Sequence, residues 1–273
     1  MRALLLSTGL LACALVSAGP RVIDDAGRTL ELHAPAKRIV TLAPHAAELV
    51  VAAGAGAGLA GISAASNVEG VPAGLPVIGG PGALDRERLL ALRPDLVIAW
   101  QSGNRAADIA WLERIDVPLF ISEPRNLRDI ERSIRAIGAL AGSSERAQLR
   151  ADTFAARVHA GCPENTPLPV YVEVWHRPRL TLGGDHWIND VLTRAGFRNV
   201  FAQVGRNVIA LSDEAALAHA GLPRISLIRR FDGSADDHLA GLLSRPGPRL
   251  AEAIDILCRR HAHHSGRPDG RPR

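Results

Sequence analysis

The 273-residue sequence has few aromatic side chains and none of the short motifs that mark common hydrolases or nucleotide-binding enzymes. Phe, Trp and Tyr together make up 4% of the residues, and Tyr and Met occur once each. There is no G-x-S-x-G turn, no H-E-x-x-H zinc motif and no glycine-rich phosphate loop. These absences argue against a catalytic function. The catalytic alternative is a secreted hydrolase built on a doubly wound α/β sheet.

After residue 18 the chain also lacks any run of about 20 apolar residues, so no transmembrane helix is predicted. Residues 1–18 have one early charge, Arg2, followed by an apolar run and a small-residue cleavage site at Ala18. We therefore predict a Sec signal peptide and a soluble mature protein. Cleavage before Cys13, as in a lipoprotein, would leave an unusually short signal.

The body of the protein has no excess of basic charge, although the isoelectric point of the whole sequence is about 9.6. The formal net charge is +4, and Arg2 with the arginines after residue 258, offset by Asp269, contributes more than all of it. The residues between them therefore carry a slightly negative charge. No basic face for a nucleic acid is expected.

Only three cysteines are present, and Cys13 lies in the predicted signal peptide. Cys162 and Cys258 would enter an oxidising compartment, where a disulfide can form. Their spacing alone does not decide whether they pair, so both possibilities stay open.

Residues 84–104 predict one complete structural unit. Asp85 is a good N-cap, and the leucines that follow it supply the apolar face of a short helix that Pro94 ends. Residues 95–100 are almost continuously apolar, which is typical of a strand covered on both faces in a parallel sheet. The polar segment 101–104 comes next, at the end of the strand where open α/β sheets bind their ligands.

The same alternation of strands and helices recurs along the chain. About 250 mature residues are enough for two α/β lobes. Residues 21–32 predict a hairpin. Strands are expected at 38–42, 118–121, 169–174 and 224–228, and helices at 44–53, 127–141, 144–160 and 188–195.

Candidate binding residues stand at the predicted strand ends: Pro44, His45, Trp100, Gln101, Trp175, His176 and His186. His45 could ligate the metal of a ligand at the mouth of a cleft, or it could be a hydrogen-bonded loop histidine. No carboxylate is spaced to complete a metal site with His45, His176 and His186, so we predict no protein-bound metal. The histidines at 261, 263 and 264 fall in an Arg/Pro/Gly-rich tail that we expect to be disordered.

Three segments carry a family resemblance. LRPDLVIAWQSGN at 92–104, RIVTLAPHAAEL at 38–49 and the NDVL-x-x-AG-x-x-NVF pattern at 189–201 resemble the periplasmic cobalamin-binding proteins. These proteins are the substrate-binding subunits of cobalamin ABC importers, and their relatives bind haem or ferric siderophores. The resemblance extends over residues 22–258.

The resemblance implies a class III periplasmic binding protein, with two Rossmann-like lobes joined by a long helix and only a small closure on binding ligand. We expect a signal peptide at 1–18, an N-terminal lobe at 19–125, an inter-lobe helical region at 126–164, a C-terminal lobe at 165–260 and a disordered tail at 261–273. The expected location is the periplasm, and the expected state is a monomer. Family members can pair the cysteine equivalent to Cys258 with one near Ala195, which is absent here.

The implied ligand is cobalamin or a related corrinoid, carried as a transported ligand with no cofactor involved. A large ring with a fringe of amides needs apolar walls and scattered hydrogen-bonding groups. Several family positions near the ligand differ here: Ala65 replaces a usual tyrosine, Pro81 and Val208 stand where tryptophans can occur, and Leu242 and Leu243 replace an aromatic pair. We therefore expect a looser or altered site.

The implied partner is the dimeric permease of an ABC importer in the inner membrane. Glu87 and Glu214 match the family glutamates that dock onto permease arginines. Each is the second residue of a predicted helix, after Asp85 in one lobe and Ser212 in the other. One carboxylate per lobe would suit a twofold transporter.

The second lobe departs from the family pattern at residues 221–245. A strand, crossover helix and further strand need about 30 residues, more than this segment provides. We predict that part of a βα unit is missing there.

Overall fold

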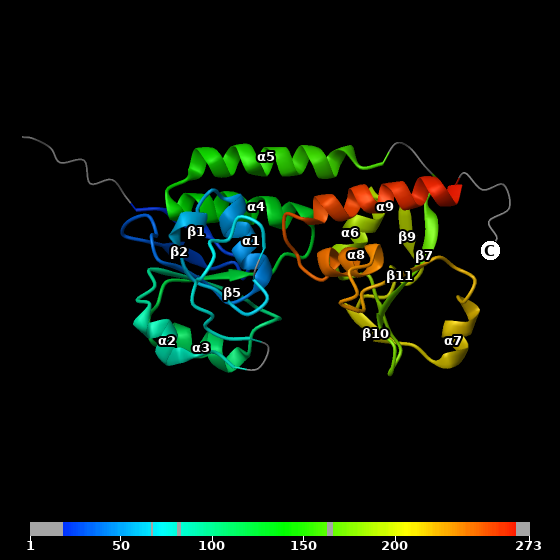
Figure 1. Cartoon of the computed structure of the whole chain (residues 1–273), viewed down its shortest axis with the longest axis horizontal. Coiled ribbons are helices and arrows are strands. Elements are labelled where there is room, and N and C mark those ends of the chain that lie inside the picture. The colour runs from blue at the N-terminus through cyan, green and yellow to red at the C-terminus, as the bar shows by residue number, and fades with distance from the viewer. Residues whose placement is uncertain (1–18, 67, 81–82, 163–165, 266–273) are drawn as a thin grey trace, which may run out of the picture.

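The computed structural model describes residues 19–66, 68–80, 83–162 and 166–265. Two α/β lobes lie side by side beneath a long helix that extends over both (Figure 1). The predicted signal peptide, with Cys13, and Pro81 lie outside the described residues. No described helix is both long enough and apolar enough to cross a membrane.

The N-terminal lobe contains a four-stranded parallel sheet in the order β4-β3-β5-β6. Its strands are β3 (Ile39–Thr41), β4 (Leu59–Gly61), β5 (Leu96–Trp100) and β6 (Leu119–Ser122). The predicted hairpin is formed by the antiparallel strands β1 (Arg21–Ile23) and β2 (Thr29–Glu31). The helices are α1 (Pro44–Ala52), the 3₁₀ turn η1 (Gly56–Gly58), α2 (Arg86–Ala91) and α3 (Ala106–Arg114).

Strand β5 is covered on both faces, as its apolar run predicted. Leu96 and Ile98 join one hydrophobic cluster, whereas Val97 and Ala99 join a second cluster with residues of α2 and α3. The Asp85 side chain accepts a hydrogen bond from the Arg88 amide and caps α2 as expected. The successive residues of β5 thus join the helix layers on both sides of the sheet.

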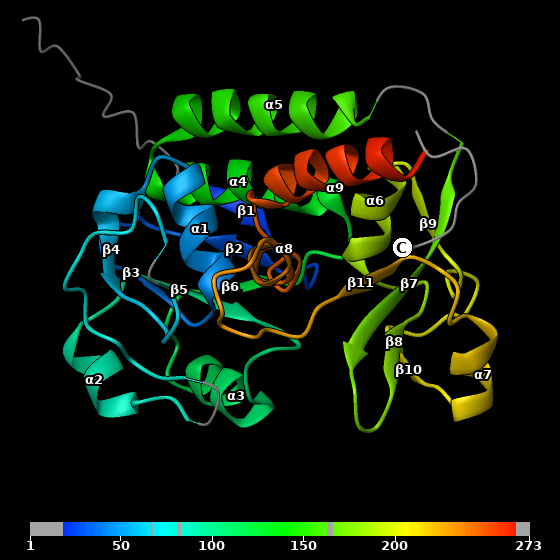
Figure 2. The same ribbon diagram turned by 45° about the vertical axis from the view of Figure 1, so that its right-hand side comes forward.

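Helices α4 (Leu127–Ala141) and α5 (Ser144–Ala160) have the predicted bounds. Asn126 caps α4 through its side chain, and Gly142 ends it in the left-handed conformation at φ 71°. Helix α5 packs against α1 and α4, and also against α6 (Trp187–Arg194) and α9 (Leu250–Ser265). It therefore joins the lobes, as expected of the inter-lobe helix (Figures 1 and 2).

The C-terminal lobe has a mixed sheet, in contrast to the parallel sheet of the first lobe. Strands β9 and β11 pair with β7 in parallel, whereas β8 pairs with β7 and β10 with β8 in antiparallel fashion. The strands are β7 (Leu168–Trp175), β8 (Leu180–Leu182), β9 (Phe197–Asn199), β10 (Val208–Ala210) and β11 (Arg224–Ser226). The helices are α6 (Trp187–Arg194), α7 (Asp213–Ala218), α8 (Ala235–Leu243) and α9 (Leu250–Ser265).

The chain beyond β11 is short, as the spacing predicted. Strand β11 forms an edge of the sheet, and within the described ranges no strand follows it before or after α8. Asp237 organises the connection, because it accepts hydrogen bonds from the Arg229 side chain and from the amides of Arg230 and Phe231. These bonds, with Arg229 the largest contributor, hold the pKa of the Asp237 carboxyl well below its usual value.

The prediction that the disordered tail begins at residue 261 is wrong for residues 261–265, which complete α9. His261 is 1% exposed and meets the Phe197 ring edge-on at 5.2 Å. Its Nε2 lies 3.3 Å from the Thr166 carbonyl oxygen. This histidine belongs to the packing of the second lobe and not to a metal-binding tail. Residues 266–273 lie outside the described part of the chain.

Cys162 and Cys258 form a disulfide, which decides the question that their spacing left open. The Cys162 amide donates to the Arg194 carbonyl at 3.0 Å, so Cys162 lies beside the turn that contains Ala195. Cys162 therefore lies close to the position near Ala195 where family members can have the cysteine that pairs with the equivalent of Cys258. It fastens the chain just beyond α5 to α9 of the second lobe.

Removing this disulfide should lower stability substantially. The bonded residues are 96 positions apart, and constraining so long a loop in the unfolded chain is worth about 4 kcal/mol in the loop-entropy model. We expect the Cys162→Ser, Cys258→Ser variant to melt roughly 10 °C lower in calorimetry, at the scale of about 2–4 °C per kcal/mol for a chain of this size. An unchanged melting temperature would show that the covalent link adds nothing to the packing of α5 and α9.

Candidate functional site

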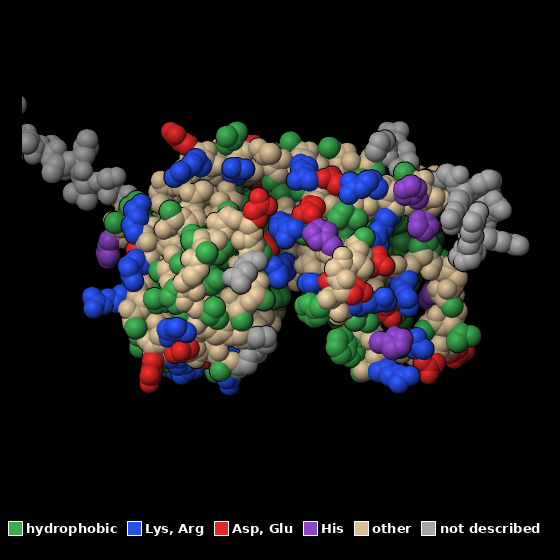
Figure 3. All heavy atoms as spheres, in the orientation of Figure 1, with side chains coloured by type: hydrophobic (Ala, Val, Ile, Leu, Met, Phe, Trp, Pro, Cys, Tyr) green, Lys and Arg blue, Asp and Glu red, His purple; other side chains and the backbone are tan. Residues whose placement is uncertain are grey.

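The surface is hollowed between the two lobes, on the side away from α5 (Figure 3). A pocket of about 500 Å³ in this cleft is lined by the segment after β6 in one lobe and by the start of α6 in the other. Its walls include the ring of Trp187 and His186 and the polar side chains of Glu123, Arg125, Asp185, Asn189, Asp190 and Asn207. The cleft thus offers both an aromatic surface and scattered hydrogen-bonding groups.

Trp100 ends β5 and is fixed there by the loop that follows. The Asn104 side chain accepts from the Trp100 amide at 2.7 Å and donates to the Leu42 carbonyl at 2.9 Å. Gly103 lies against the indole, because a Cβ atom at position 103 would come within 1.9 Å of a ring atom. The sequence GN after the strand therefore supports one position of the Trp100 side chain.

The aromatic rings of the two lobes meet in a row. Trp100 contacts Trp187 at 6.4 Å between ring centroids and His45 at 5.0 Å, both in edge arrangements. The His186 and Trp187 rings lie 3.8 Å apart. Strand β5 supplies Trp100, α1 supplies His45 and the start of α6 supplies the other two. Pairs of this kind favour edge or offset contacts, so the row joins the lobes.

His45 lies beneath Trp100 and not at the mouth of the cleft, where it was predicted. It is 1% exposed, and its Nε2 lies 3.1 Å from the Ser122 hydroxyl. Burial, with a smaller effect of Arg245, lowers its pKa to about 3, so the imidazole is neutral. This geometry supports the alternative of a hydrogen-bonded structural histidine.

His186 is the N-cap of α6. Its Nδ1 accepts from the Ile188 amide at 3.3 Å, which leaves the proton of the neutral ring on Nε2. Burial lowers its pKa to about 4. His186 therefore lines the cleft as a neutral ring that can donate one hydrogen bond.

These two histidines should make the protein acid-sensitive. Because the folded-state pKa of each is lowered, the stability they contribute is present above about pH 6.5 and is lost as pH falls toward 4 and 3. Each histidine should lower the free energy of unfolding by roughly 2 kcal/mol between pH 7 and pH 5. We expect the His45→Gln, His186→Asn variant to lose less unfolding free energy than the wild type over that interval in denaturant titrations; equal losses would contradict the assignment.

Glu48 has the opposite effect on the pH dependence of stability, because its protonation stabilises the fold as the pH falls. The effect of the histidines is therefore measured by comparing the wild type with the variant. Burial raises its pKa, against the effect of Arg245, so the folded protein takes up this proton at a higher pH than the unfolded chain does. Because both proteins retain Glu48, the difference between their pH profiles reports the histidines.

The other predicted residues do not line this pocket. Trp175 is the last residue of β7, and His176 follows it in the turn to β8. Trp175 is 53% exposed and donates to the Arg177 carbonyl, and His176 Nδ1 lies 3.2 Å from Glu173 Oε1.

Gln101 is exposed next to Trp100, whereas Pro44 is half-buried at the first position of α1. The structure does not bring Trp175 and His176 into the aromatic row.

The segment between α8 and α9 crosses to the first lobe. Arg245 Nη2 donates to the carbonyl of Ala65, which is exposed, and Nη1 lies 3.4 Å from the buried Glu48 Oε1.

Leu242 and Leu243 are buried, so they belong to the core, whereas Val208 is 40% exposed. Arg245 and Trp187 were missed by the sequence analysis. Trp187 could have been predicted from its place in the sequence. It comes shortly after a strand and two glycines in the second lobe, and the polar loop of the first lobe likewise comes directly after a strand.

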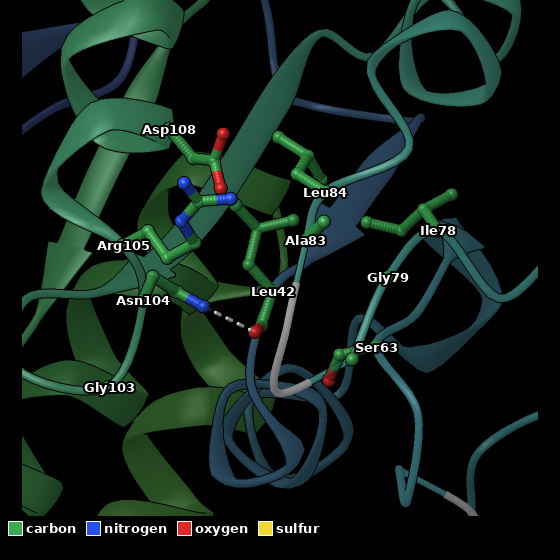
Figure 4. Close-up of a pocket in the computed structure, with 11 residues that line it drawn as sticks. Leu42, Ser63, Ile78, Gly79, Ala83, Leu84, Gly103, Asn104, Arg105 and Asp108 are labelled. Carbon is green, nitrogen blue, oxygen red and sulfur yellow. Dashed lines mark hydrogen bonds between the residues drawn. The ribbon is translucent and has the colours of Figure 1, made fainter.

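A smaller pocket of about 30 Å³ lies within the first lobe at the carboxyl ends of its strands (Figure 4). Ser63, Ala83 and Leu84 face Asn104 and Asp108 across it. Its walls come from one lobe only. The inter-lobe pocket is larger and is the better candidate for a ligand held between the lobes. Within the described ranges no three His, Cys, Asp or Glu side chains converge to hold a metal.

Glu87 and Glu214 are exposed on α2 and α7, which lie at the lower outer corners of the two lobes in Figure 1. Ser212 caps α7 through its side chain, as Asp85 caps α2. The helix positions of both glutamates are as predicted.

Comparison with known proteins gives the family. The family model of the periplasmic binding proteins matches residues 39–247. This chain belongs to the periplasmic binding protein family. The vitamin B12-binding protein of Vibrio cholerae is 27% identical to this binding protein over 82% of this chain and 88% of its own length. That of Vibrio campbellii is 31% identical over 67% of each chain.

The fold is that of a class III periplasmic binding protein. The crystal structure of the periplasmic vitamin B12-binding protein BtuF of Vibrio cholerae superimposes with a TM-score of 0.72 at 26% identity, covering 85% of this chain and 99% of that one. The haem-binding protein RhuT of Roseiflexus sp. RS-1 has a TM-score of 0.66 at 23% identity, with 82% and 98% covered, and shows the fold alone. Members of this family are binding proteins.

Proposed function

We propose that the chain is a periplasmic substrate-binding protein that captures cobalamin or a related corrinoid between its lobes and delivers it to an ABC importer. The corrinoid is the transported ligand and not a cofactor. The observation that carries the proposal is the aromatic pair of Trp100 and Trp187, which joins the lobes beside a polar pocket. The vitamin B12-binding relatives support the ligand.

The proposed contacts follow from the chemistry of a corrin ring. Trp100 and Trp187 offer apolar surfaces to the ring, with Pro44, Ala65 and Trp175 at the edges of the cleft. Gln101, His176 and His186, together with the polar wall of the pocket, offer hydrogen bonds to the amides. His45 positions Trp100 from below and does not touch the metal.

Separate calorimetric titrations with cyanocobalamin, haemin and a ferric siderophore test the ligand. We expect micromolar or tighter binding of cyanocobalamin, with one molecule per chain. Tight binding of haemin with none of cyanocobalamin would reverse the ligand assignment in favour of the haem-binding relatives. Turnover of ester or phosphate substrates would instead favour a secreted hydrolase.

Delivery requires a membrane partner, and we propose the permease dimer of the importer. Glu87 and Glu214 are exposed on α2 and α7, which lie at the outer ends of the two lobes. One carboxylate on each lobe matches a partner that presents the same cation twice. The proposed location is the periplasm, reached through the Sec signal peptide predicted at residues 1–18.

A further inference from the structure

The segment between β11 and α8 holds one phenyl ring out into solvent. Phe231 is 81% exposed, the highest value among the large apolar side chains of the described residues. Its backbone has a φ of 57°, a left-handed conformation that is uncommon for residues other than glycine. Such a conformation is strained and persists only where the surrounding contacts impose it. The position of this ring is therefore set by the contacts around it.

Asp237, in the first turn of α8, fixes the segment. Its Oδ1 accepts hydrogen bonds from the amides of Arg230 and Phe231 at 2.7 and 2.9 Å. The same carboxylate pairs with the Arg229 guanidinium through both oxygens, at 2.9 and 3.0 Å. That guanidinium lies over the Phe231 ring, 4.7 Å from its centroid. One face of the ring is thus backed by a cation that is itself fixed, and the high exposure of the side chain leaves the other face to solvent.

This segment packs on the side of α8 that faces the first lobe. Asp237, Gly241 and Arg245 follow one another at intervals of four residues, which places them along one face of α8 and its continuation. Arg245 donates to the Ala65 carbonyl of the first lobe, so this face is turned toward that lobe. Arg229 lies on the same face, because it pairs with Asp237 and a Cβ atom at Gly241 would come within 2.7 Å of its Nη1. Figures 1 and 2 show the orange segment that leads from β11 into α8 on this side of the second lobe.

The segment also begins at the end of the sheet where a ligand is expected. Strand β11 is parallel to β7, and the Leu227 amide donates to the Glu173 carbonyl near the end of β7. The carboxyl ends of parallel strands are where open α/β sheets bind their ligands. At the other end of α8, the Leu243 carbonyl accepts a hydrogen bond from Trp187 Nε1 at 3.3 Å. The segment and its helix therefore connect the carboxyl end of the sheet to a tryptophan of the cleft.

We propose that Phe231 is a ligand-contacting residue of the second lobe, and that the open face of its ring packs against the apolar part of the bound corrinoid. The inference rests on the proposed function and adds a residue that the pocket around Trp187 does not include. Apolar side chains of the second lobe border the hollow between the lobes (Figure 3). A corrinoid in this hollow would cover the ring, whereas a protein partner would have to reach in between the lobes. Because the ring is fixed before the ligand arrives, contact with it costs little conformational entropy.

Replacing Phe231 with alanine should weaken cyanocobalamin binding in calorimetry by about tenfold, because the burial of a phenyl ring is lost. Phe231→Leu keeps an apolar side chain of similar reach and should lose less than about threefold. Neither variant should lower the melting temperature, since the ring is exposed and does not belong to the core. Leu149→Ala is the matched control: Leu149 is 67% exposed on α5, on the opposite side of the molecule, so its loss should not change the affinity.

Hydroxyl-radical footprinting with mass spectrometry gives a readout that a purely structural role would not change. The Phe231 ring should be oxidised readily in the free protein, and saturation with cyanocobalamin should slow this oxidation several-fold. Leu149 in the same sample corrects for radicals that the ligand itself consumes, because it is exposed far from the cleft.

Protection of Phe231 together with weaker binding by Phe231→Ala supports the inference. Saturable cyanocobalamin binding with unchanged oxidation of Phe231, or with an unchanged affinity of Phe231→Ala, would overturn it and leave the proposed function standing. Absence of cyanocobalamin binding by the wild type would overturn both. Protection that appears without ligand as the protein concentration rises would assign the ring to a contact with a second copy of this chain, and would also overturn the inference.

Discussion

Replacing Trp100 with alanine is expected to weaken cyanocobalamin binding by roughly 30- to 1,000-fold, because a central aromatic contact in a desolvated site is worth about 2–4 kcal/mol. Trp100 contacts both His45 and Trp187, so its loss removes the middle of the row that joins the lobes. Calorimetry on the purified protein measures the effect. The aromatic surface should matter more than any single polar contact, since the polar groups of the cleft are also satisfied by water when no ligand is present.

Two further variants separate loss of the ring from loss of stability. Trp111→Ala removes a tryptophan of α3 that packs with Arg86, outside the aromatic row. It should lower the melting temperature with little change in affinity. Gly103→Ala keeps the Trp100 ring but places a methyl group against it, so it should also weaken binding. Undiminished affinity of Trp100→Ala, with an intact fold, would remove the row from the binding site.

Local sequence patterns predicted much of the fold. Helical spacing predicted helices at 127–141 and 144–160, and α4 and α5 have these bounds. The apolar run of β5 predicted a strand buried on both faces, and Asp85 predicted the start of α2. Each of these signals lies within the element it predicts, so no distant contact was needed to interpret it.

Features that depend on distant contacts were missed. The final turn of α9 is polar and histidine-rich, and it is ordered because His261 packs against Phe197 from a strand far away in the chain. His45 follows a buried strand, yet only the position of Trp100 and Ser122 decides that its ring points inward. The antiparallel pairing of β8 and β10 likewise gives no signal within either strand. The candidate site was therefore located by its strands, but its inner and outer residues were not distinguished.

The Glu87→Ala, Glu214→Ala variant should keep its affinity for cyanocobalamin within about twofold but lose most of the stimulation of the importer's ATPase. Both glutamates lie on exposed helices at the ends of the lobes, and neither lines the cleft pocket. An exposed ion pair alone contributes only about 0.2–1 kcal/mol, but complementary charges also orient the approach of two proteins and raise the association rate. Removing both charges should therefore slow docking by more than the two pair energies suggest.

Glu145 provides a matched control for these charges, because it is also the second residue of its helix and is exposed on α5, away from α2 and α7. Glu145→Ala removes a comparable first-turn carboxylate, so any general effect of losing a helix-start charge appears there too. Single variants at Glu87 and Glu214 should each retain part of the stimulation, since one lobe can still engage. Raising the salt concentration should weaken the wild type toward the double variant, whose own coupling should change little. Full ATPase stimulation by the double variant in reconstituted membranes at physiological salt would show that the two carboxylates do not dock the protein.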